Sequence, residues 1–227
     1  MQLSTETTRP SHLELVDGVV VEHGRSALAS RRFGDLVIAS VATIVAAIPM
    51  VILALLVKAT SSGPVLFRQD RVGRGGVHFR VMKFRTMTDG THDDVLSSET
   101  DRRRYIENDF KLDSNDCRIT RLGRVLRKTS LDELPQLINV LRGDMSLVGI
   151  RPLVPVELGM RPLRDQQLYA TLRPGVTGLW QVEGRSTLGK VERLELDRRY
   201  VETWSPWQDV KILARTPLAL LRIRHTH

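Results

Sequence analysis

A run of 22 residues without a charged side chain, from Leu36 to Val57, constrains this sequence more than any other feature. Most of these residues are Ala, Val, Ile or Leu, and one helix over the run is long enough to cross a bilayer. A buried core helix is the alternative, but this length without a charge favours membrane insertion. Basic residues flank both ends, so the positive-inside rule gives no orientation.

Pro49 lies just past the middle of this run, where it removes a backbone hydrogen bond and favours a bend. A helix that enters the bilayer, bends at Ile48 and Pro49 and returns would leave both basic flanks at the cytoplasmic surface. The sequence therefore permits a re-entrant helix-hairpin over residues 31–60 as well as a simple span.

The remaining chain predicts an α+β protein that is mainly helical. Residues 64–88 predict a small β-hairpin, because two short strand-like stretches flank the glycines of the turn at 73–76. Residues 118–128 and 190–203 place apolar residues on one side of a helix and charges on the other. These two segments predict amphipathic surface helices, and the first can lie on a membrane or pack on the protein.

The charge balance predicts anionic partners. The chain has 34 Lys and Arg residues against 26 Asp and Glu residues, which gives a formal charge of +8. Nucleotides, phospholipid headgroups and nucleic acid all fit such a surface. A nucleic-acid-binding module would need aromatic side chains among its basic runs, but aromatic residues are only 5% of this chain. We therefore expect no nucleic acid partner.

Two adjacent carboxylates, Asp132 and Glu133, lie inside a basic frame that includes Arg127 and Arg151. Apolar residues at helical spacing accompany the pair, at Leu131, Leu134, Ile138 and Leu141. This spacing predicts a helix whose first turn holds both carboxylates. An ionised carboxylate near a helix N-terminus and several cations can attack phosphorus, or it can hold a divalent metal that neutralises a phosphate.

A structural alternative exists for the same residues. Ser130 and Glu133 match a capping box, in which both side chains close a helix N-terminus and do no chemistry. Spacing alone favours this alternative. Pro135 opposes it, because the proline ring would face the carbonyl of Leu131 in a helix that is capped at Ser130.

Three further cations are candidate phosphate ligands. Lys83 and Arg85 belong to a basic run at residues 80–85 and could hold a diphosphate, although a solvated basic face is a fair alternative. Arg185 lies in a loop rich in proline and glycine and could also bind phosphate.

Four segments together resemble the bacterial sugar transferases, the monotopic polyprenyl-phosphate phosphoglycosyl transferases. The segments are GPVLFRQDRVGRGGVHFRVMKFRTM, RITRLGRVLRKTSLDELPQLINVLRGDMSLVGIRP, LRPGVTGLWQVEGRS and DRRYVETWSPWQDVKIL. They follow the family's order over roughly residues 30–217. The short length resembles the minimal catalytic form of the family.

This resemblance implies transfer of a sugar 1-phosphate from a UDP-sugar to undecaprenyl phosphate, with release of UMP. Asp132 would be the nucleophile that forms a phosphosugar-enzyme intermediate beside Mg²⁺, and Glu133 would assist proton transfer or metal placement. Lys83, Arg127 and Arg151 match family positions around the phosphates, and Asp197 matches another essential acidic position.

The resemblance also implies a re-entrant membrane helix and three regions: a polar arm at 1–30, the membrane segment at 31–60 and a cytosolic catalytic domain at 61–227. The expected location is the bacterial cytoplasmic membrane, with the active site on the cytoplasmic face, in the first membrane step of a glycan pathway. The oligomeric state is open, and a homodimer is one option.

Two residues differ from those that are usual in the family. Ile48 precedes Pro49 where the family often has serine, and Ile150 replaces the proline that usually precedes Arg151. Two other functions compete with the family interpretation: a membrane-anchored glycosyltransferase that releases UDP, and a basic membrane-bound module that binds nucleic acid.

Overall fold

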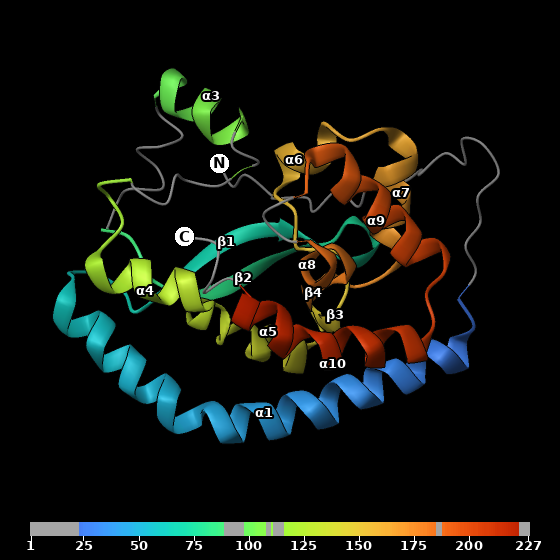
Figure 1. Cartoon of the computed structure of the whole chain (residues 1–227), viewed down its shortest axis with the longest axis horizontal. Coiled ribbons are helices and arrows are strands. Elements are labelled where there is room, and N and C mark those ends of the chain that lie inside the picture. The colour runs from blue at the N-terminus through green and yellow to red at the C-terminus, as the bar shows by residue number, and fades with distance from the viewer. Residues whose placement is uncertain (1–22, 89–97, 108–109, 111–115, 185–187, 223–227) are drawn as a thin grey trace, which may run out of the picture.

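The computed structural model describes residues 23–88, 98–107, 110, 116–184 and 188–222. Its largest element is helix α1, Arg25–Thr60, which bows along one side of the protein (Figure 1). The helix continues through Pro49 without a break, so the expected hairpin of two helical arms is not confirmed. A proline removes one hydrogen bond from a helix, and here the result is a curved helix rather than a turn. The helix also begins at Arg25, inside the predicted N-terminal arm.

The apolar side chains of α1 are exposed. Those with large exposed surfaces include Val37, Val41, Ile44, Val45, Ile48, Val51, Ile52 and Leu55. Among the described residues, α1 is the one helix that is long and apolar enough to cross a membrane, and only 6% of its most apolar stretch is buried. A core helix would bury this surface against the protein, so the exposure favours a lipid environment.

The predicted β-hairpin is confirmed. Strand β1, Leu66–Val72, pairs antiparallel with β2, His78–Phe84, and the short 3-10 turn η1, Arg74–Gly76, joins them. Gly75 and Gly76 both have positive φ angles, which glycine adopts without steric cost. Phe67 faces Lys83 and Arg71 faces Phe79 in the register, so Lys83 and Arg71 lie on one face of the hairpin.

Helices and one small parallel sheet complete the fold (Figure 1). Strand β3, Ser146–Val148, pairs with β4, Gly175–Thr177. The remaining helical elements are α3 (Glu99–Glu107), α4 (Arg121–Thr129), η2 (Leu131–Glu133), α5 (Gln136–Arg142), α6 (Pro155–Gly159), α7 (Leu163–Thr171), α8 (Leu179–Glu183), α9 (Lys190–Glu202) and α10 (Pro206–Arg222). The protein is therefore mainly helical α+β. Helix α4 confirms the first predicted amphipathic helix, and α9 confirms a helix at the second position, although it exposes Val191 and buries Asp197.

Polar contacts attach the N-terminal part of α1 to this body. The Asp35 carboxylate accepts hydrogen bonds from the Ser146 hydroxyl at 2.6 Å and from the Leu147 amide at 3.0 Å. Arg32 donates to the backbone carbonyls of Val140 and Leu141 at the end of α5. The N-terminal part of helix α1 is thus packed into the folded domain through specific hydrogen bonds.

A buried asparagine joins α5 to the hairpin. The Asn139 side chain is fully buried; its oxygen accepts from the Met82 amide at 3.0 Å. Its amide nitrogen donates to the Arg80 carbonyl at 2.8 Å and to the Asp144 carboxylate at 3.1 Å. These bonds fix the position of β2, which carries Lys83, relative to the segment that carries Asp132 and Glu133.

We expect Asn139→Ala to destabilise the protein by about 2–4 kcal/mol, because it leaves the Met82 backbone amide and the Arg80 carbonyl without hydrogen-bond partners. Thermal unfolding of the detergent-solubilised protein measures the effect. Asp144→Ala removes only one of the three bonds and should lower the unfolding midpoint less. An equal loss in both variants would contradict the role assigned to Asn139.

Candidate active site

The acidic pair lies in a tight turn between two helices. Helix α4 ends at Thr129, and Ser130, which follows it, adopts the left-handed conformation with φ of 58°. Asp132 and Glu133 occupy the 3-10 turn η2, and Pro135 directly precedes α5. The prediction that both carboxylates begin the following helix was therefore wrong, because Pro135 delays its start to Gln136. The capping box is absent as well, since the Ser130 side chain does not cap η2.

Basic side chains from two other elements meet the acidic pair. The Lys83 ammonium group from β2 lies 2.6 Å from the Glu133 carboxylate. Asp132 is only 8% exposed, and this burial, opposed by the charge of Lys83, raises its pKa to about 6. Glu133 raises that pKa further and Arg127 lowers it. The structure thus brings together Lys83, Arg127, Asp132 and Glu133, which we call the dyad cluster.

A close helix approach delivers Arg127 to this cluster. A methyl group on Gly123 of α4 would lie 2.0 Å from the backbone oxygen of Thr86, so no larger residue fits there without displacing the helix. Thr120 caps the helix by accepting from the Gly123 amide at 2.9 Å. The Arg127 Nε atom then donates to the Thr86 hydroxyl at 2.9 Å. Sequence analysis missed Gly123 and Thr86, because nothing local indicates a contact between segments so far apart.

Arg151 and Asp197 belong to a second group of charges, the Arg151 cluster, which also contains Glu157 and Arg161. Arg151 lies 2.7 Å from Glu157, and Arg161 lies 3.0 Å from Asp197. Burial raises the pKa of Asp197 to about 6, while Arg161 and Arg151 lower it. Sequence analysis predicted neither Arg161 nor Glu157 as partners.

The hairpin connects the two clusters. Arg71, on the same hairpin face as Lys83, donates to the Pro152 carbonyl at 2.8 Å, next to Arg151. Burial and the charge of Arg151 lower the pKa of Arg71, and Tyr105 of α3 opposes that change. Burial also lowers the pKa of Arg127, where Asp132, Asp116 and again Tyr105 act in the opposite direction.

Two of the predicted phosphate ligands are not part of this site as described. The Arg85 guanidinium is buried and donates to the Ser61 hydroxyl and to the carbonyls of Ser61 and Pro64, just after α1. Its donors thus stabilise the end of the helix, in contrast to the diphosphate contact that we predicted. Arg185 lies outside the described residues.

The acidic pair fits the ligand preference of Mg²⁺. Within the described ranges, no group of three or more His, Cys, Asp or Glu side chains could hold a metal ion. Magnesium in phosphate-binding enzymes often takes only one or two protein carboxylates and completes its shell with water and substrate phosphates. Asp132 and Glu133 offer adjacent carboxylates whose repulsion a cation would relieve.

Comparison with known proteins identifies the family of this chain. The family model described as bacterial sugar transferase matches residues 26–223. This chain belongs to the bacterial sugar transferase family. The match includes α1 and both charged clusters.

Relatives of this bacterial sugar transferase come from several organisms. It is 43% identical over 201 residues to the undecaprenyl-phosphate galactose phosphotransferase of Salmonella typhimurium, covering 87% of this chain and 42% of that protein. It is 42% identical over 203 residues to the UDP-glucose:undecaprenyl-phosphate glucose-1-phosphate transferase of Caulobacter vibrioides, covering 84% and 69%. An uncharacterized sugar transferase of Haemophilus influenzae is 44% identical over 189 residues, covering 82% and 40%.

The chain thus spans about two fifths of the length of the Salmonella and Haemophilus relatives. The family match at residues 26–223 contains both the dyad cluster and the Arg151 cluster.

The raised pKa of Asp132 predicts that burying this carboxylate lowers the free energy of unfolding by an amount that depends on pH. The carboxyl has an ordinary pKa of 3.8 when unfolded and a pKa of about 6 when folded, so stability falls as the pH rises through this window. At about pH 7.5 without Mg²⁺, Asp132→Asn should therefore be more stable than the native protein, by on the order of 2 kcal/mol. Near pH 4.5 the difference in stability between Asp132→Asn and the native protein should be smaller.

Thermal unfolding at the two pH values measures this difference. Asp70→Asn, which removes an exposed carboxylate on β1, is the matched control. A destabilised Asp132→Asn variant at about pH 7.5 would show that the buried carboxylate stabilises the fold, against this account.

Proposed function

We propose that this bacterial sugar transferase moves a sugar 1-phosphate from a UDP-sugar to undecaprenyl phosphate and releases UMP. The observation that carries the proposal is the buried Asp132 carboxylate, which Lys83 and Arg127 help to keep ionised near neutral pH. The names of the Salmonella and Caulobacter relatives support both the lipid acceptor and the phosphosugar.

In the proposed reaction, Asp132 is the nucleophile. One of its oxygen atoms attacks the sugar-bearing phosphorus, and the bond between that phosphorus and the bridging oxygen breaks, so UMP leaves with the electron pair. A phosphate oxygen of undecaprenyl phosphate then attacks the same phosphorus and regenerates the carboxylate. Partial burial leaves Asp132 poorly hydrated, which favours attack.

The neighbouring charges offset the repulsion between these anionic reactants. Lys83, held 2.6 Å from Glu133, and Arg127, held by Thr86, lie where negative charge accumulates. Asp132 and Glu133 would hold Mg²⁺, which neutralises phosphate charge when it is bound. Glu133 additionally positions the Lys83 ammonium group.

The Arg151 cluster would bind the rest of the donor. Arg71 and Lys83 share a face of the hairpin, four positions apart in register, or roughly 14 Å along the strand. An extended nucleoside diphosphate sugar can contact both clusters across this face. Arg151 would then contact phosphate, and Asp197 would hold Arg161 in place through their ion pair.

The membrane location follows from α1. Its exposed apolar surface supports insertion into the bacterial cytoplasmic membrane, and its bowed shape supports shallow entry with both ends on the cytoplasmic side, where the active site would lie (Figure 1). Undecaprenyl phosphate would reach Asp132 from the same membrane. The reaction would be the first membrane step of a bacterial glycan pathway.

Nucleotide release tests the proposal. Purified protein in nanodiscs, given Mg²⁺, undecaprenyl phosphate and a panel of UDP-sugars, should release UMP with at least one donor. Asp132→Asn should lower the rate by on the order of 1,000-fold, because it removes the nucleophile. Asp70→Asn, on the exposed face of β1, should keep the native rate.

Release of UDP in place of UMP would indicate that only the sugar moves, as in a membrane-anchored glycosyltransferase. That result would remove the role assigned to Asp132. UMP release that is unaffected by Asp132→Asn would contradict the proposal as well.

A further inference from the structure

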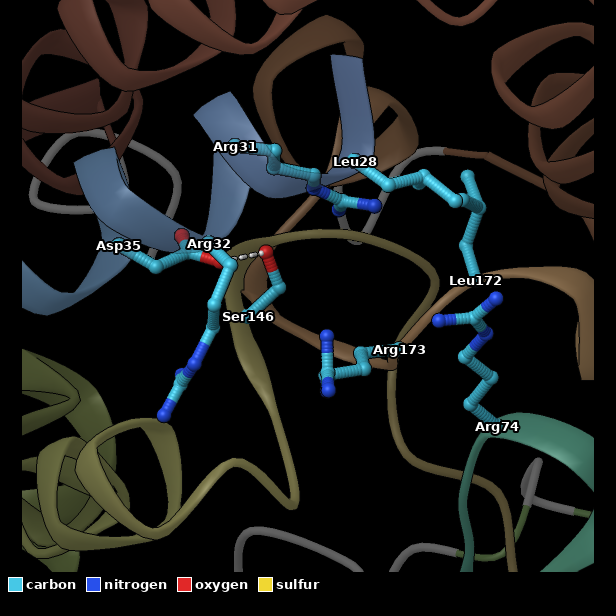
Figure 2. Close-up of a pocket in the computed structure, with 8 residues that line it drawn as sticks. All are labelled: Leu28, Arg31, Arg32, Asp35, Arg74, Ser146, Leu172 and Arg173. Carbon is cyan, nitrogen blue, oxygen red and sulfur yellow. Dashed lines mark hydrogen bonds between the residues drawn. The ribbon is translucent and has the colours of Figure 1, made fainter. Parts of the chain in front are cut away.

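A pocket on the α1 side of the protein contains none of the residues of the two charged clusters in its lining. Figure 2 shows side chains from four separate parts of the chain around it. The lining residues are Leu28, Arg31, Arg32, Asp35, Arg74, Ser146, Leu172 and Arg173. The pocket is open to solvent and encloses only about 10 Å³, roughly the space of one water molecule. None of its residues has a role in the reaction proposed above.

Positive charge is in excess in this pocket. Its lining includes four arginines and a single carboxylate, Asp35. Asp35 already accepts hydrogen bonds from Ser146 and Leu147. Arg31 has a carboxylate partner outside the lining, Asp209, at 3.1 Å. Even with both carboxylates counted, two of the four arginine charges are not compensated.

The four arginines differ in what they bind. Arg32 donates to the Val140 and Leu141 carbonyls, and Arg31 donates to the Val148 carbonyl and to the Tyr200 hydroxyl. These two side chains are fixed by the fold and contribute charge to the pocket.

Arg74 and Arg173 have N–H donors that make no hydrogen bond to the described residues. Arg173 donates through Nε to the Gly143 carbonyl at 2.7 Å, and no described residue accepts a hydrogen bond from its two terminal nitrogens. The Arg74 side chain, at the tip of the β-hairpin, has no acceptor among the described residues. Burial, followed by the charges of Arg32, Arg74 and Arg31, lowers the pKa of Arg173.

Arg173 distinguishes this pocket from an ordinary basic surface. An exposed arginine such as Arg74 can remain solvated and indicates nothing alone. Arg173 is half-buried and is held beside three other cations by its bond to Gly143, which is unfavourable without a counter-charge. An oxyanion that accepts hydrogen bonds from Arg74 and Arg173 would supply that charge.

The geometry points to an anion-binding site in which Arg74 and Arg173 bind a phosphate group, with Arg31 and Arg32 supplying additional positive potential. The group belongs either to a phospholipid headgroup or to free phosphate. Arg31 and Arg32 precede the apolar part of α1, which would place the pocket near headgroup level if α1 inserts.

Occupancy of this site would also join elements of the fold. Arg32 and Arg173 both bind carbonyls at the C-terminal end of α5, the helix that follows the Asp132–Glu133 turn. Arg74 belongs to the hairpin that carries Lys83. One bound phosphate would therefore connect the hairpin with the segment before β4, whose Arg173 is bonded to the end of α5. This inference does not depend on the proposed reaction, because it concerns binding alone.

The test measures the thermal stability of the full-length protein in maltoside micelles as a function of ligand concentration. The two probes are inorganic phosphate and dihexanoyl phosphatidylglycerol below its micelle concentration, with chloride at matched ionic strength as reference. The native protein should show saturable stabilisation by at least one probe. Arg74→Ala should weaken the apparent affinity about tenfold, because it removes charged hydrogen bonds to the anion.

Arg68→Ala is the matched control, since it removes an exposed arginine from the same hairpin outside the pocket lining. It should bind like the native protein. A response to phosphatidylglycerol alone assigns the site to a lipid headgroup, whereas a response to inorganic phosphate assigns it to the free anion. No saturable effect of either probe, or the same affinity in Arg74→Ala as in the native protein, would overturn the inference.

Discussion

The Asp132 carboxylate is 8% exposed and faces the charges of Lys83, Glu133 and Arg127. Burial favours its protonated form, while the two cations favour the ionised form that can attack phosphorus. Each cation must therefore be held in place by the fold. Asn139 fixes the hairpin that carries Lys83, and the packing of α4 on Thr86 fixes Arg127. The site thus depends on contacts between elements far apart in sequence.

The helix that we propose to enter the membrane is attached to the same fold. Helix α1 exposes its apolar residues, yet Asp35 and Arg32 near its N-terminal end bind the backbone of β3 and α5. At its C-terminal end, Arg85 binds the carbonyls that follow the helix. Helix α1 and the active site are consequently connected through buried polar contacts, which would limit how deeply α1 could insert relative to Asp132 in the proposed membrane arrangement.

Local patterns in the sequence predicted those parts of the protein that depend on local chemistry. The glycines of the turn predicted the hairpin, and apolar periodicity predicted α4 and α9. The acidic pair in its basic frame predicted a charged site at Asp132, and the family resemblance predicted Lys83 and Arg127 in it. Sequence could not predict the direction of Arg85, which depends on where α1 ends, or the pairing of Asp197 with Arg161, which depends on tertiary packing. Pro135 did carry a signal that the helix starts after the acidic pair.

The most direct measurement is the mass of the protein after reaction with a UDP-sugar and Mg²⁺ in the absence of undecaprenyl phosphate. The account predicts a mass increase equal to one sugar phosphate after an acid quench, located by peptide mapping at Asp132. The adduct should be absent from Asp132→Asn, and undecaprenyl phosphate should remove it from the native protein. An adduct on a different residue, or acceptor-dependent UMP release with no adduct at all, would contradict nucleophilic attack by Asp132.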